Sequence, residues 1–154
     1  MPQLRQVLLA IVCSLGVFAA DSAAASDQSD VAATIKKWVS DFNNGDRKAF
    51  LAACAPRTSV VDAFPPYAWS TCTDWMNDYK KNSQAIQLTE GTLWIGEPSY
   101  VDIAGSRAYA VYPATFSDNE KDKSVVYKGF WAMTLHKTTR GWVFTGSGSA
   151  WSGT

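Results

Sequence analysis

The sequence has 154 residues, with 14 basic and 14 acidic side chains and a formal net charge of zero. Without an excess of basic residues it lacks the electrostatic signature of a protein that binds nucleic acid or an anionic membrane surface. It contains a single histidine, His136, so it cannot form a zinc site of the usual histidine and cysteine spacing, and we expect neither a metal nor a cofactor.

The first 25 residues have the pattern of a cleavable signal peptide. Arg5 precedes an apolar run over residues 7–20, and the small residues Ala23 and Ala25 have the spacing that a signal peptidase requires. The apolar run is shorter than the about 18 residues that span a bilayer. We therefore expect cleavage after Ala25, a single mature domain over residues 26–154, and a periplasmic or secreted protein that is not attached to a membrane.

Two cysteines, Cys54 and Cys72, lie in the expected mature part of the chain. Export would bring them into an oxidising compartment, where a disulfide between them can form and persist. The alternative is a pair of separate buried thiols, because the sequence does not show how far apart the two residues lie. Both alternatives remain open at this point.

Three helices are expected in the first half of the chain. Apolar residues over 31–42 follow the three-and-four spacing of one helical face. Asp46 can cap a second, shorter helix, which Pro56 stops. A third helix opens at Thr71, whose spacing to Asp74 is that of a capping box.

The pattern changes to a period of two after the third helix, which is typical of strands. A short strand over 58–62 precedes that helix. Further stretches rich in β-branched and aromatic residues predict strands over 88–95, 100–103, 107–116, 124–135 and 142–151. Helices followed by an antiparallel meander indicate an α+β fold.

Four segments carry a resemblance to a known family: the NNGD turn, DAFPPYAW, VDIAGSRAYAV and the terminal AWS. With the order of the expected elements, they resemble the nuclear transport factor 2-like superfamily, within it the SnoaL-like proteins and, more distantly, the ketosteroid isomerases. The resemblance covers residues 31–151. It implies a cone-shaped roll, in which three N-terminal helices pack on a curved, mainly antiparallel sheet and leave an apolar pocket. Because this fold carries many unrelated activities, the resemblance does not define a reaction.

The isomerase pattern would put Asp62 at the position of the general base and Trp38 and Trp131 at the two oxyanion positions. An indole N–H donates one hydrogen bond but is not the acidic donor that stabilises an enolate, so the chain departs from the pattern at both positions. Two alternatives follow from the residues themselves. Asp62 can be a turn residue before the double proline, and Trp38 can be core.

The aromatic content favours a ligand-binding cavity: the chain has seven Trp, six Tyr and seven Phe. The expected function is an exported domain, non-catalytic or weakly catalytic, that binds a small apolar or aromatic ligand; the alternative is an isomerase or cyclase that uses Asp62 as a base next to a carbonyl. A homodimer through the outer sheet face is also expected, because Tyr109, Val111 and Pro113 share one side of a strand. The candidate ligand-binding residues are Trp38, Tyr67, Trp69, Tyr79, Trp131 and Trp151.

Overall fold

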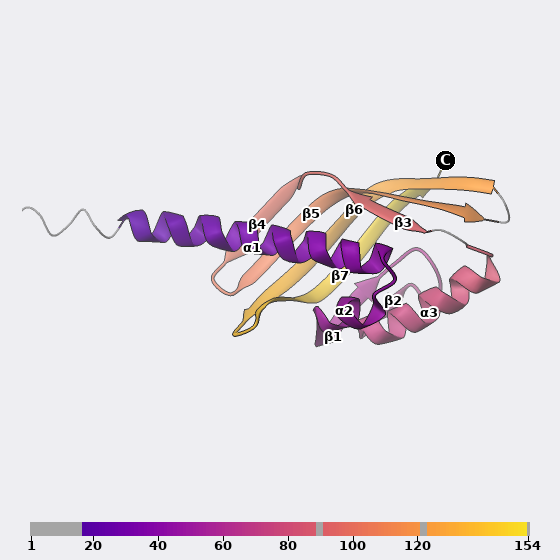
Figure 1. Ribbon diagram of the computed structural model, residues 1–154, viewed down its shortest axis with the longest axis horizontal. Helices are drawn as coiled ribbons and strands as arrows, with labels where there is room; N and C mark the ends of the chain where they lie inside the picture. Colours follow the sequence, from indigo (N-terminus) through magenta and orange to yellow (C-terminus); the bar gives the residue numbers. More distant parts are fainter. Residues whose placement is uncertain (1–16, 89–90, 121–122, 154) are drawn as a thin grey trace, which may run out of the picture.

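The computed structural model of the chain describes residues 17–88, 91–120 and 123–153. Within these ranges the helices are α1 (Val17–Asn43), α2 (Arg47–Ala52) and α3 (Cys72–Ala85). The strands are β1 (Cys54–Val61), β2 (Ala68–Trp69), β3 (Thr92–Ile95), β4 (Tyr100–Ala104), β5 (Arg107–Glu120), β6 (Lys123–Thr138) and β7 (Gly141–Gly153). Figure 1 shows α1 lying across one face of the sheet, with α2 and α3 next to β1 and β2.

All the strands form one sheet in the order β2-β1-β7-β6-β5-β3, and β4 also pairs with β5. Strands β3 and β4 lie along successive parts of the same edge of β5. The pairs are antiparallel except for β1 and β7, which run parallel, with Val61 next to Gly148. The expected α+β architecture with a mainly antiparallel sheet is confirmed, and the short edge strand β2 adds to it.

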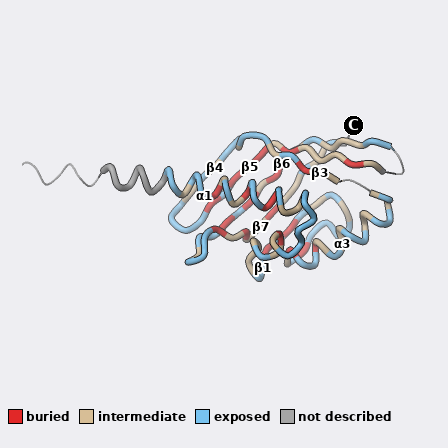
Figure 2. The backbone as a smooth tube through the Cα atoms, viewed as in Figure 1, coloured by how far each residue is buried: buried red, intermediate tan, exposed pale blue. Residues whose placement is uncertain are grey.

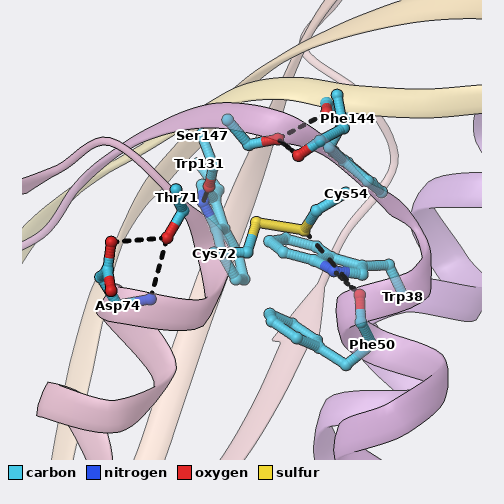
Figure 3. Close-up of a disulfide and its surroundings, with 11 residues drawn as sticks. Trp38, Phe50, Cys54, Thr71, Cys72, Asp74, Trp131, Phe144 and Ser147 are labelled. Carbon is cyan, nitrogen blue, oxygen red and sulfur yellow. Dashed lines mark hydrogen bonds between the residues drawn. A yellow bond between two sulfur atoms is a disulfide. The ribbon is translucent and has the colours of Figure 1, made fainter.

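The predicted helix caps of α2 and α3 are confirmed. Asp46 accepts a hydrogen bond from the backbone N–H of Ala49 at the start of α2. Thr71 accepts one from the N–H of Asp74 at 3.0 Å and donates to the Asp74 carboxylate at 2.7 Å (Figure 3). These bonds satisfy backbone groups that have no partner within a helix end, so they fix where α3 begins.

Several element boundaries differ from the expected ones. Strand β1 begins at Cys54, not at residue 58, and contains Pro56. Strands β5 and β6 extend to Glu120 and Lys123, so their hairpin tip is shorter than the expected 117–123 turn. Cross-strand pairing that the local pattern does not encode extends these strands.

Helix α1 begins before the expected helix over 31–42 and reaches back to Val17. The first sixteen residues of the expected signal peptide lie outside the described residues. From residue 25 onward, the first buried side chain is that of Val31, and the side chains of 25–30 are exposed or half-buried. No helix in the described ranges is long and apolar enough to cross a membrane.

The core lies between the inner face of the sheet and the helices (Figure 2). In β5, Ala108, Ala110, Tyr112 and Ala114 are buried and alternate with more exposed neighbours, which confirms the period of two in this strand. In the same core, the ring of Trp38 is stacked 4.5 Å from Phe50 and 4.3 Å from Phe144, measured between centroids.

A disulfide joins Cys54, the first residue of β1, to Cys72, the first residue of α3. The Cα atoms are 6.5 Å apart, and Figure 3 shows the bridge beside the rings of Trp38 and Trp131. Of the two alternatives that the sequence left open, the structure has the bridge. The bond therefore fastens α3 to the sheet close to the aromatic core.

Candidate ligand-binding cavity

A cavity of about 310 Å³ lies between α3 and the inner face of β5, β6 and β7. This volume is in the range of small-molecule sites. The lining consists mainly of aromatic and aliphatic side chains with a few polar groups: Phe42, Asp62, Ala63, Phe64, Trp75, Tyr79, Asn82, Ile86, Leu88, Leu93, Phe116, Tyr127, Trp131, Ser149 and Trp151.

The Asp62 carboxylate is held by four hydrogen-bond donors. One oxygen accepts from the Ser149 hydroxyl at 2.6 Å, the backbone N–H of Ala63 at 2.8 Å and the indole N–H of Trp151 at 3.3 Å. The other oxygen accepts from the indole N–H of Trp75 at 3.0 Å. Three separate parts of the chain thus converge on one carboxylate, which is fixed in a single orientation.

The pairing of β1 with β7 explains how Asp62 meets two of these donors. Because Val61 is next to Gly148 in the parallel pair, the following residue, Asp62, comes beside Ser149. Side chains two residues apart in a strand share a face, so Trp151 follows Ser149 on the same side of β7. The donor from α3, Trp75, lies in the first turn of that helix, next to the disulfide and the cap at its start.

The backbone of Asp62 is also held, by hydrogen bonds within the turn that follows it. The Asp62 N–H donates to the carbonyl of Tyr67 at 3.1 Å, and the Tyr67 N–H donates to that of Phe64 at 2.8 Å. The turn contains a cis peptide bond between Pro65 and Pro66. Asp62 is therefore a turn residue and a cavity residue at once, which joins the two alternatives that the sequence left open.

Aromatic rings form the wall around Tyr79. Its ring centroid lies 5.3 Å from that of Trp75, 5.5 Å from Phe42 and 6.2 Å from Phe64. Burial raises the pKa of the Tyr79 phenol to about 12, and the negative charges of Asp118 and Asp62 add to this effect. The phenol therefore stays protonated throughout the physiological range.

Of the candidate residues taken from the sequence, the structure brings Asp62, Tyr79, Trp131 and Trp151 to the cavity. Trp131 is paired opposite Ser149 across β6 and β7, so its ring lies on the same inner face. Its indole N–H, however, donates to the hydroxyl of Ser147 at 2.5 Å.

Trp38 does not line this cavity. It is 2% exposed, and its N–H donates to the carbonyl of Phe50 at 3.2 Å, so its ring packs in the core between α1 and the sheet. Of the two alternatives for Trp38, a cavity residue or a core residue, the structure has the core residue.

Tyr67 and Trp69 also lie outside the cavity lining, for different reasons. Tyr67 is in the turn with a positive φ of 72° and is 58% exposed. Trp69 is paired with Val60 and is buried against Phe64, and its N–H donates to the Asp78 carboxylate at 3.0 Å. The short strand β2, which the sequence pattern did not reveal, determines this placement.

Sequence reasoning missed Ser149, which, like Trp75, also absent from the candidate residues, donates a hydrogen bond to Asp62 in the cavity. Its two-residue spacing to Trp151 would have put it on the same face of the last strand, so a signal was available. Its contact with Asp62 could not be predicted from the sequence, because that contact depends on the parallel pairing of β1 with β7.

Across the described ranges, no group of three or more His, Cys, Asp or Glu side chains is arranged to hold a metal ion. The polar groups at Asp62 are instead neutral hydrogen-bond donors around one carboxylate.

The sequence matches no known family model, and no curated protein matches it significantly. The structure is similar to an NTF2-like protein with a cystatin-like fold from Novosphingobium aromaticivorans, with a TM-score of 0.74 and 14% identity over 91% of each chain. It is also similar to a nuclear transport factor 2 (NTF2-like) superfamily protein from Salmonella enterica, with a TM-score of 0.71 and 14% identity over 83% of this chain and 92% of the other.

The chain has the NTF2-like fold. A hexachlorocyclohexane dehydrochlorinase (LinA) Type2 shares it, with a TM-score of 0.74 and 6% identity over 87% of this chain and 91% of the other. The NTF2-like architecture expected from the sequence is thus confirmed. At these identities the likeness concerns the fold, and activity has to be argued from the cavity itself.

Proposed function

We propose that this chain is an exported domain that binds a small, largely apolar molecule in the cavity around Asp62. The observation that carries the proposal is a cavity of about 310 Å³ whose wall is mostly aromatic and whose one carboxylate is held rigidly by Ser149, Trp75 and Trp151. Apolar walls supply binding energy, and a fixed polar group orients the ligand.

Export is supported by the signal-peptide pattern and by the distribution of buried residues. From residue 25 onward, the first buried residue of α1 is Val31, so every core residue that the structure describes lies after the expected cleavage site. The disulfide between Cys54 and Cys72 fits an oxidising compartment.

Proton abstraction by Asp62 next to a substrate carbonyl, the alternative function, has less support. Its carboxylate oxygens already accept four hydrogen bonds, three of them on one oxygen, so only the oxygen bound by Trp75 has a position left for a substrate proton. An enolate also needs donors in the cavity. The indoles at the two oxyanion positions are engaged elsewhere, Trp38 with Phe50 and Trp131 with Ser147.

We also propose that two copies pair through the outer sheet face. Four large side chains on this face are 41–55% exposed: Trp94, Tyr100, Tyr109 and Phe130. The strand register puts all of them on the side of β5 opposite to its buried alanines. An exposed apolar face of this kind suits a two-fold contact between identical surfaces. Light scattering that gives a monomer at all concentrations would contradict the pairing.

Native mass spectrometry of the protein purified from the periplasm or medium tests the binding function. We expect an added mass from a bound small molecule, and we expect Ile86→Trp, which fills the cavity, to lose it. Tyr100→Ala, on the outer sheet face, is the matched control and should retain it. An adduct that survives Ile86→Trp would contradict binding in this cavity.

A further inference from the structure

The cavity contains a negative charge without a basic side chain to balance it. Among the residues that the structure describes, no lysine, arginine or histidine lines the cavity, and none makes an ion pair with Asp62. An aspartate is ionised at neutral pH. Its donors, Ser149, Trp75, Trp151 and the N–H of Ala63, are neutral groups that orient the charge without cancelling it.

The geometry leaves room for one more donor on this carboxylate. A carboxylate has about four lone-pair positions, two on each oxygen. One Asp62 oxygen accepts three hydrogen bonds, whereas the other accepts only that of Trp75. A ligand that donates a hydrogen bond to the second oxygen would complete the coordination of the carboxylate.

The aromatic wall favours the same sign of charge on the ligand. The faces of Trp and Tyr rings attract cations, and cages of such rings with a nearby carboxylate recognise ammonium groups. The rings of Trp75, Trp151, Tyr79 and Phe64 line the cavity together with Asp62. Burial raises the pKa of the Tyr79 phenol, and the charges of Asp118 and Asp62 raise it further.

We propose that the ligand of this cavity is an apolar molecule that carries an ammonium group, which pairs with the Asp62 carboxylate against the aromatic wall. This inference rests on the proposed binding function and adds the charge class of the ligand to it. An anionic ligand would be repelled by Asp62. A neutral hydrocarbon would exclude water from the carboxylate without pairing it, which costs free energy.

A series of probes with the same ring and different charge tests the inference on the wild-type protein. Benzylamine and benzyltrimethylammonium are cations at neutral pH, benzyl alcohol is neutral, and benzoate is an anion. Binding is followed by the indole N–H resonances of Trp75 and Trp151. We expect benzylamine to bind about tenfold more tightly than benzyl alcohol, as for one charge-assisted hydrogen bond, and benzoate to bind most weakly. Benzyltrimethylammonium has the charge but no N–H to donate, so it should bind between benzylamine and benzyl alcohol.

Two variants, each of which removes one negative charge, separate the effect of the Asp62 carboxylate from that of the net charge of the protein. Asp62→Asn should reduce the preference for the cations over benzyl alcohol to about twofold or less, in line with loss of the charged contact. Asp102→Asn, on the exposed side of β4, should leave the preference unchanged. If Asp62→Asn does not fold, the salt dependence of binding to the wild-type protein is measured instead. Added salt should weaken the binding of the cations but not that of benzyl alcohol.

The outcomes distinguish the inference from the function on which it rests. If benzyl alcohol or benzoate shifts the two indole resonances at concentrations as low as the cations do, the ligand class is wrong and the binding function stands. If none of the probes shifts them, the binding function fails together with the ligand class. A preference for the cations that Asp102→Asn abolishes equally would also overturn the inference.

Discussion

The indole of Trp75 donates its N–H to the carboxylate of Asp62 at 3.0 Å and so links α3 to the end of β1. Three residues earlier in the same helix, Cys72 is bridged to Cys54 at the other end of β1. Helix α3 is thus attached to β1 by a hydrogen bond and a covalent bond. The two attachments keep the aromatic wall of the cavity at a fixed distance from Asp62.

Trp75→Phe should lower the free energy of unfolding by about 1 to 2 kcal/mol more than Trp142→Phe does, because both replace a buried indole with a smaller phenyl ring and only Trp75→Phe also loses a hydrogen bond to a charged group. Trp142→Phe is the matched control, since the buried N–H of Trp142 has no hydrogen-bond partner in the described structure. Urea denaturation measures both. Equal effects of the two substitutions would contradict a role of Trp75 in holding Asp62.

Reduction of the disulfide should destabilise the wild-type protein by about 3 kcal/mol, as expected for a cross-link over a loop of this length. Cys54→Ala should have a lower melting temperature that reducing agent does not change. Thermal melts with and without reductant test this, and titration of two free thiols in the unreduced, unfolded wild type would contradict the bridge.

Tyr79 should make the stability depend on pH in the alkaline range. Its phenol has a pKa of about 12 in the folded chain, above the ordinary value of about 10, because burial penalises the charged form. The stabilisation is therefore fully present below pH 10 or so and is lost as the pH rises through about 12, in total on the order of 2 kcal/mol. Tyr79→Phe should flatten this part of the profile; an unchanged alkaline profile in the variant would contradict the assignment.

Gly129 should be intolerant of a side chain, because a Cβ at this position would overlap the carbonyl of Ala150 in the neighbouring strand. Gly129→Ala should cost about 1 to 3 kcal/mol as β7 moves away, and it should also displace Trp151, which is paired with Gly129. Gly148→Ala is the control, since its Cβ would meet only Val61 at 3.9 Å. Chemical denaturation of the two variants tests the difference.

The export prediction concerns the mature amino terminus. Cleavage after Ala25 should give a soluble product that begins at Ser26 and retains the buried residues that the structure describes in α1, the first of which is Val31. Intact-mass measurement and amino-terminal sequencing of the protein recovered from the periplasm or medium test this. A membrane-bound product that retains Met1 would contradict it.

Much of the fold could be predicted from the sequence, because the helix caps and the strand alternation are encoded by residues close together in the chain. The caps at Asp46 and Thr71 and the alternation in β5 depend on neighbouring residues, and all of them are confirmed. The pairing of β1 with β7 was not accessible, since it joins residues far apart in the chain and leaves no local signature. Strand β2 has two residues, too few for a period to be recognised.

The candidate site could be predicted only in part, because it also depends on pairing between residues far apart in the chain. Asp62, Tyr79, Trp131 and Trp151 line the cavity, and their aromatic type or turn position had drawn attention to them. Trp38 has the same chemistry but packs in the core. Composition identifies side chains that are suited to a cavity, whereas the register of the sheet decides which of them face it.

The most direct test of the central claim is to locate a bound molecule on the wild-type protein by isotope-filtered NOE spectroscopy, with benzylamine as the probe. Binding in the cavity predicts NOEs from the probe to the ring protons of Trp151 and Tyr79, and none to Trp94 or Tyr109 on the outer sheet face. NOEs to the outer-face residues without any to Trp151 and Tyr79 would contradict the proposal that this cavity binds the ligand.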